Sequence, residues 1–121
     1  MRNVDPQDLV THYYNKKRIY HLVQKVYRFL KDNPGYLSFV KIPPRKEGRS
    51  IIQNRGYYTD EDCTIEIDYR FEIIPTLIHE CLHHFHPDWS ERKVEKEERV
   101  VMALLSKKQA INLLKALAKA L

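Results

Sequence analysis

The sequence is poor in cysteine and in long apolar runs, and each shortage excludes a class of protein. Its 2 cysteines are too few for a disulfide scaffold, so we expect a cytoplasmic chain with reduced thiols. No apolar run reaches the ~18–20 residues that a membrane span needs. Residues 1–6 contain no apolar signal-peptide core, so secretion is not expected either.

The length and composition are those of one small globular domain. The chain has 121 residues, of which 43% are hydrophobic and 31% are charged, and we expect residues 1–121 to form a single domain. Lys and Arg number 21 against 16 Asp and Glu, which gives a net charge of +5. Small domains carry such a charge for solubility alone, so it favours acidic partners only weakly.

The spacing of apolar residues predicts an α+β domain in the order α-β-β-β-α-α-α. Helices are predicted over about 8–32, 75–86, 88–105 and 107–121, and strands over 36–42, 51–59 and 64–69. The strict alternation in 64–69 makes it the clearest strand, with Ile65, Ile67 and Tyr69 on one face. Residues 43–50 are predicted to form a polar, basic loop.

Two capping signatures predict where the last two helices begin. Asp88 is followed three residues later by Glu91, a pattern typical of a capping box, which assigns Glu91 to capping. Ser106 and Gln109 repeat the signature before the last helix. Both helix starts therefore have a local chemical reason.

The residues His79-Glu80-Cys81-Leu82-His83 form an H-E-x-x-H pattern in a predicted helix. Residues four apart lie on one helix face, so His79 and His83 can bind one zinc ion. Glu80 lies beside them and can take a proton from a water whose pKa the metal lowers to about 7. The alternative is that the histidines bind no metal. The combination with Glu80 favours the zinc site, and Cys81 is expected in the core.

A catalytic zinc needs a third protein ligand and one open position. His86 lies about 10 Å from His79 along the helix axis, which is too far for both to bind one ion. No histidine follows it, so we expect an acid from the next helix. Glu98 interrupts an apolar stripe, where a lone carboxylate is costly unless it meets a cation. Glu95 is the alternate if the two helices pack antiparallel.

An H-E-C-L-H sequence followed fifteen residues later by a helix glutamate resembles the gluzincin metallopeptidases. The small size, the helix and three strands before the motif and the short Pro-Asp-Trp-Ser link resemble the minigluzincins. The resemblance implies a minimal zincin-like domain, a zinc cofactor, a peptide or protein substrate, and a latent form blocked by a chain segment. It implies His79 and His83 as ligands, Glu80 as general base and acid, and Glu98 or Glu95 as third ligand.

Two parts of such a site stay open in the sequence. Strand 64–69 is either the sheet edge that binds substrate beside the cleft, as in zincins of this kind, or an ordinary half-buried strand. Tyr57, Tyr58 and His86 are each candidates to stabilise the oxyanion that forms during hydrolysis.

Other functions are kept as alternatives. A DNA-associated protease of the SprT type would contact phosphates through the basic 45–49 loop and the first helix. The basic residues of that helix are Lys16, Lys17, Arg18, Lys25, Arg28 and Lys31. The zinc site of such proteases has three histidine ligands, and this chain lacks the third histidine. A module without catalysis would bind nucleic acid or hold a closed, structural zinc. A hydrolase of non-peptide amides would resemble peptide deformylases, with Cys63 as the upstream ligand.

Overall fold

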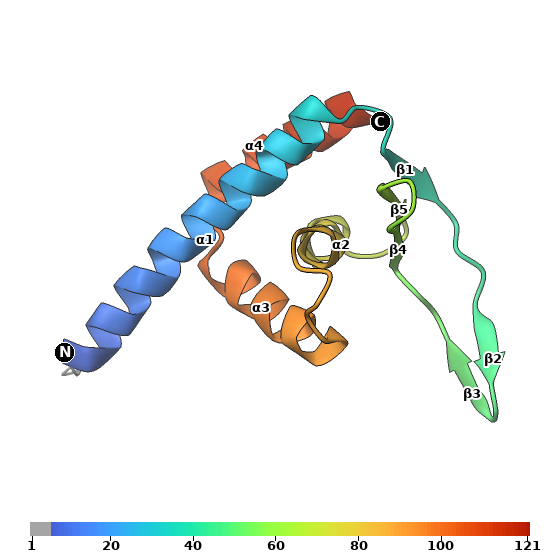
Figure 1. The fold of residues 1–121 in the computed structure, drawn as a ribbon, viewed down its shortest axis with the longest axis horizontal. Coiled ribbons are helices and arrows are strands. Elements are labelled where there is room, and N and C mark those ends of the chain that lie inside the picture. Colours follow the sequence, from blue (N-terminus) through green and yellow to red (C-terminus); the bar gives the residue numbers. More distant parts are fainter. Residues whose placement is uncertain (1–5) are drawn as a thin grey trace.

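The computed structural model describes residues 6–121, and the side chains from residue 15 onward (Figure 1). Its elements are α1 (Pro6–Asp32), β1 (Leu37–Val40), β2 (Arg45–Glu47), β3 (Ser50–Ile52), β4 (Gly56–Thr59), β5 (Thr64–Asp68), α2 (Ile73–Phe85), α3 (Glu91–Leu104) and α4 (Lys107–Ala120). The predicted α+β class is confirmed. Within residues 6–121, no helix is both long and apolar enough to cross a membrane.

The main sheet has the strand order β1-β5-β4, so β5 is its centre. β1 pairs with β5 in parallel, and β4 pairs with it antiparallel. Ile65 and Ile67 are fully buried, as the alternation predicted, whereas Tyr69 lies after the strand and is exposed. The interpretation of 64–69 as the edge strand is wrong, because both of its sides are paired. The free edge next to the motif helix belongs to β4.

A second, two-stranded sheet corrects two predictions between residues 43 and 59. The predicted loop contains β2, and the predicted strand 51–59 is divided into β3 and β4. β5 ends at Asp68, whose amide bonds to the carbonyl of Arg55, so the chain before Arg55 pairs instead with β2. Gly48, at φ +64°, takes the left-handed conformation in the tight turn between β2 and β3. This hairpin projects away from the helices (Figure 1).

The core lies around α2, which packs against the sheet on one side and α3 on the other (Figure 1). α1 packs against α4 along the outside of the molecule. Cys81 is fully buried, which confirms its predicted place in the core. The other fully or almost fully buried apolar residues of this core include Ile19, Val26, Leu30, Ile65, Ile67, Leu77, Ile78, Leu82, Val94, Val101 and Leu113. The core thus packs against the apolar face of α2, and the face that carries His79 is turned toward a surface groove described below.

Candidate metal centre

The two histidines of α2 meet at one point of the molecular surface. Nε2 of His83 lies 3.2 Å from Nε2 of His79, and both side chains are partly exposed. Two nitrogen ligands of a tetrahedral zinc ion, each about 2.1 Å from the metal, lie about 3.4 Å apart. The spacing of the two nitrogen atoms therefore matches what one bound ion requires.

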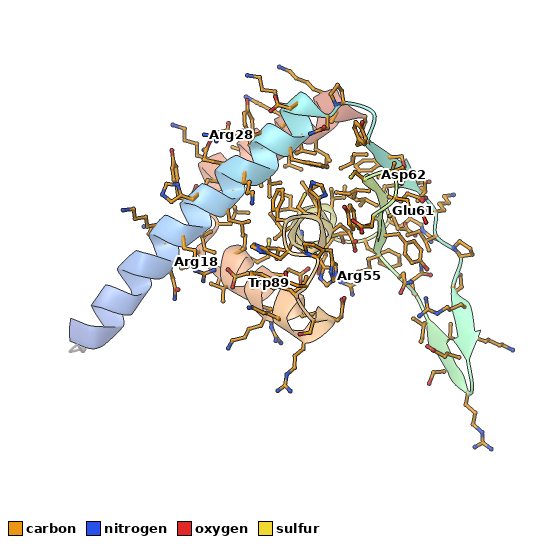
Figure 2. The ribbon with its side chains drawn as sticks, in the orientation of Figure 1. Arg18, Arg28, Arg55, Glu61, Asp62 and Trp89 are labelled. Carbon is orange, nitrogen blue, oxygen red and sulfur yellow. The ribbon has the colours of Figure 1, made fainter. Side chains whose placement is uncertain are left out.

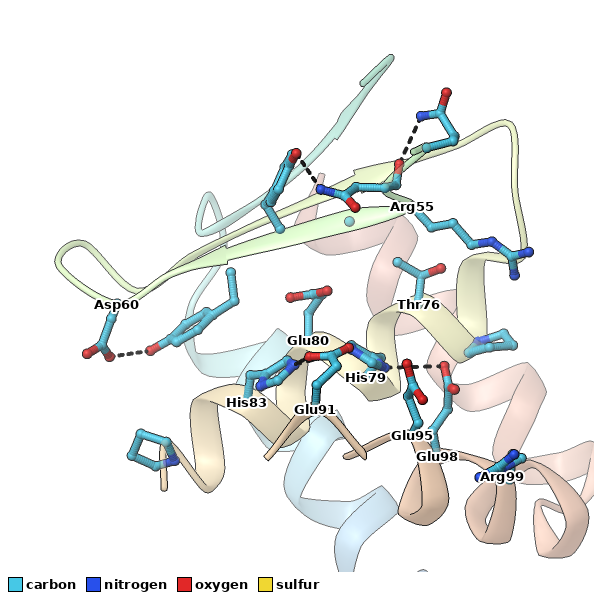
Figure 3. Close-up of a pocket in the computed structure, with 17 residues that line it drawn as sticks. Arg55, Asp60, Thr76, His79, Glu80, His83, Glu91, Glu95, Glu98 and Arg99 are labelled. Atoms are coloured by element: carbon cyan, nitrogen blue, oxygen red, sulfur yellow. Dashed lines mark hydrogen bonds and ion pairs between the residues drawn. The ribbon is translucent and has the colours of Figure 1, made fainter. Parts of the chain in front are cut away.

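Glu91 supplies the third donor at this point. Its Oε1 lies 2.7 Å from Nε2 of His79, and its Oε2 lies 2.8 Å from Nε2 of His83 (Figure 3). Donor atoms of the three residues all lie within 4.8 Å of one another, so the group could hold a metal ion. Two imidazoles and one carboxylate therefore offer three donors to a metal ion beside the groove.

Glu91 is available because α3 begins at a different residue from the predicted one. Ser90, not Asp88, caps the helix, and its side chain accepts a hydrogen bond of 3.2 Å from the amide of Lys93. The predicted capping box of Asp88 and Glu91 is therefore wrong. Ser90 is itself a strong capping residue, so a signal for this start was present in the sequence. The capping box of Ser106 and Gln109 is confirmed.

The two acids expected as third ligand lie in the same groove. Oε1 of Glu98 is 3.8 Å from Nδ1 of His79, the ring nitrogen that does not face His83. Glu95 also lines the groove (Figure 3). Burial raises the pKa of Glu98, His79 opposes that rise, and Glu95 adds to it. Glu98 and Glu95 stay predictions, and the geometry adds Glu91 as the acid that contacts both histidines.

Glu80 is the buried acid of the site. Its carboxylate points into the space between β4 and the two histidines (Figure 3), and only 7% of the residue is exposed. Burial raises its pKa to about 7, although His79 opposes the rise. The Glu80 side chain lines the groove beside the two histidines. It can therefore accept a proton from a molecule in the groove.

The groove above the site has a volume of about 800 Å³, with β4 along one wall. A Cβ on Gly56 would lie 2.7 Å from Cγ2 of Thr76 and 3.2 Å from Cγ of Glu80. Glycine therefore lets β4 approach α2 closely. Because the amide of Asp68 bonds to the carbonyl of Arg55, the antiparallel alternation turns the main-chain groups of Gly56 and Tyr58 toward the free edge.

Of the three candidates for oxyanion stabilisation, two line the groove and one does not. Tyr57 and Tyr58 line the groove, and the Tyr58 hydroxyl lies 2.8 Å from Nδ1 of His84. His86 is outside the groove lining and stacks on Trp89, with ring centroids 3.8 Å apart. His84 packs against the rings of Phe29 and Tyr58. The two tyrosines remain the candidates that reach the groove.

The basic residues of α1 are partly engaged within the molecule. Arg18 forms an ion pair with Glu97 where α1 meets α3 (Figure 2), and Lys25 lies over the ring of Phe85. Cys63 contacts Tyr58 and Asp60 and is not part of the His79 group.

Comparisons of the chain with protein-family models, curated proteins and solved structures gave no match. The motif and its geometry therefore carry the functional interpretation.

Proposed function

We propose that this chain is a zinc-dependent peptidase of the gluzincin type, built on a minimal zincin-like domain. The observation that supports the proposal is the convergence of His79, His83 and Glu91 beside the buried carboxylate of Glu80. A free strand edge borders the same groove, which suits a substrate in extended conformation.

Zinc fits this donor set better than the hard cations do. Imidazole nitrogens suit zinc, whereas calcium and magnesium prefer sites built from oxygen atoms. In the proposal, His79, His83 and Glu91 would hold the ion, and the groove would admit a substrate beside it. When bound, zinc would polarise the scissile carbonyl and make the attacking water more acidic.

Glu80 moves the proton in this reaction. Its carboxylate takes a proton from the water that attacks the scissile carbonyl, and then gives it to the leaving amine. Gly56 and Tyr58 offer main-chain hydrogen bonds that would hold the substrate as an added strand along β4. The substrate backbone would then be fixed next to the reacting groups.

The test measures zinc bound to the full chain, alone and after substitution of the acids of α3. We expect one zinc per chain, and we expect Glu91→Ala to weaken zinc binding by more than the ~10–100-fold cost of losing an outer-sphere partner. Glu98→Ala and Glu95→Ala should cost less. Glu97→Ala is the matched control, because Glu97 is on the same helix and pairs with Arg18.

Each outcome of this test has a definite meaning. A chain that takes up no zinc is incompatible with the proposal. Loss of zinc in Glu98→Ala or Glu95→Ala, with Glu91→Ala unchanged, would move the third ligand and keep the zinc peptidase. Zinc bound without cleavage of any peptide in a mixed fluorogenic library would leave a metal module or an amidase of another class.

A further inference from the structure

The β2–β3 hairpin extends the wall of the groove beyond the metal centre. β4 is the outer strand of the main sheet, and β3 leads into it through residues 53–55. β2 follows β1 in the same way, so the hairpin prolongs the two outer strands where β5 has ended. Gln53, Asn54 and Arg55 line the groove. A peptide that leaves the groove past Arg55 would therefore run beside β3.

The base of the hairpin is fixed by an ion pair between buried Asp68 and Arg70, which the proposed reaction does not use. Asp68 is fully buried, and its carboxylate accepts hydrogen bonds from the amide of Ile42 at 2.9 Å and from Nη2 of Arg70 at 2.6 Å. Nε2 of Gln53 donates to the carbonyl of Ile42 at 2.7 Å, and Arg70 donates to the same carbonyl at 3.2 Å. The two strands are therefore held at a defined position relative to the groove.

The charge of the hairpin is opposite to that of the groove. Residues 45–52 contain Arg45, Lys46 and Arg49 against Glu47, so three positive charges and one negative charge give +2. All four side chains are exposed, and Arg45 lies 3.8 Å from Glu47, which leaves Lys46 and Arg49 as the cations outside this pair. Among the groove residues the acids outnumber the arginines; the acids are Asp60, Glu80, Glu91, Glu95 and Glu98, and the arginines are Arg55 and Arg99. The hairpin therefore favours acidic residues in a substrate, which bind at a different place from the segment in the acidic groove.

The hairpin also offers groups that suit a polypeptide. Ile51 is 71% exposed and lies opposite Lys46 in the strand register, so an apolar side chain and a cation are neighbours. Within the described residues, each hairpin strand pairs on one side only, so main-chain donors and acceptors stay free along β3. A strand edge, an apolar contact and positive charge match an extended acidic peptide. Duplex DNA would use the charge alone.

We propose that the β2–β3 hairpin, residues 45–52, is a docking arm for an extended acidic segment of the substrate, adjacent to the segment bound in the groove. This inference rests on the proposed peptidase function. It predicts that acidic residues on one side of the scissile bond strengthen binding through Lys46 and Arg49, and that the effect weakens as salt concentration rises.

The experiment measures binding of fluorescent peptides to the full chain carrying Glu80→Gln, which prevents cleavage. The peptides share one central sequence and carry a run of glutamate or of glutamine at either end. We expect the glutamate run at one end to tighten binding about 10-fold, and Lys46→Glu with Arg49→Glu to abolish that gain. Lys108→Glu with Lys115→Glu, two exposed residues of α4, is the control with the same change of charge.

The outcomes separate this proposal from the peptidase proposal. Equal binding of glutamate and glutamine peptides, or an equal loss in the hairpin and control variants, overturns the docking arm. So does tighter, hairpin-dependent binding of a short DNA duplex together with indifference to the glutamate run. If no peptide is cleaved by the parent chain but hairpin-dependent binding is seen, the peptidase assignment fails and the acidic-peptide surface stands.

Discussion

Helices α2 and α3 both supply the candidate metal centre, but they are held in different ways. In α2, the residues behind the motif are buried against the sheet and the other helices, among them Leu77, Ile78, Cys81 and Leu82. In α3, the buried residues are Val94 and Val101, and the Glu91 side chain is 60% exposed. One half of the site is thus fixed by a packed helix, and the other half by the first turn of an exposed one.

This difference separates two sources of precision in a site. The spacing of His79, Glu80 and His83 follows from one helical turn and needs no tertiary contact to be correct. The place of Glu91 depends on where α3 starts and on how it crosses α2. We therefore expect substitutions in α2 to change chemistry strongly. Substitutions that disturb the first turn of α3 but keep Glu91 should change metal affinity more gently.

The largest effect is expected for Glu80→Gln. Loss of the general base should lower kcat for peptide cleavage by about 10²–10⁴-fold, while zinc stays bound, because the amide cannot accept the proton. Steady-state kinetics with a fluorogenic peptide and metal analysis would measure both quantities. Glu97→Gln, on α3 and outside the groove, should leave kcat unchanged. Equal activities of Glu80→Gln and the parent would show that Glu80 is not the general base.

A second expected effect appears when the metal is removed with a chelator. Burial raises the pKa of Glu80 from 4.5 to about 7, so the native state holds this proton more tightly than the unfolded state does. The resulting stability is present below pH 4.5 and is lost as the pH rises to about 7, a loss of roughly 3 kcal/mol. Urea unfolding across this range should show the loss in the parent and not in Glu80→Gln. Parallel curves for the two proteins would contradict the buried-carboxyl explanation.

The smallest effect tests the start of α3. Ser90→Ala removes the cap that accepts from the Lys93 amide, and should cost about 1 kcal/mol of unfolding free energy. Ser106→Ala removes the equivalent cap of α4 and should cost a similar amount. Only Ser90→Ala should also weaken zinc binding, measured by chelator competition, because Glu91 is the next residue. Equal zinc affinities of the two variants would show that the first turn of α3 does not hold Glu91.

The parts of the fold that sequence predicted well are those with a strong local period. The four helices and strand β5 follow from apolar spacing, and the predicted boundaries lie close to the observed ones. β2 was not predicted, because Arg45-Lys46-Glu47 has no apolar alternation and is exposed on both faces. Its strand character comes from pairing with β3 across the turn at Gly48, which no local pattern of side chains reports.

In the candidate site, too, the sequence predicted the features that depend on local geometry alone. The motif pattern correctly placed His79 and His83 on one face with Glu80 beside them, because helix geometry alone decides it. The sequence pattern assigned Glu91 to a capping box with Asp88, whereas the structure has the cap at Ser90. A shift of two residues in the helix start turned a capping residue into one that contacts both histidines. Such a shift lies within the uncertainty of helix ends read from local signals.

Because the hairpin is closed at its base, its sequence can change without a change in the rest of the fold. The carbonyl of Ile42 and the side chain of Gln53 are 2.7 Å apart, so the chain enters and leaves the hairpin at neighbouring points. The segment 43–52 can therefore become longer or shorter, or change the sign of its net charge, at little cost to folding, since loop length contributes weakly to stability. Changes confined to residues 43–52 would thus alter the charge beside the groove and leave the residues that line the groove unchanged.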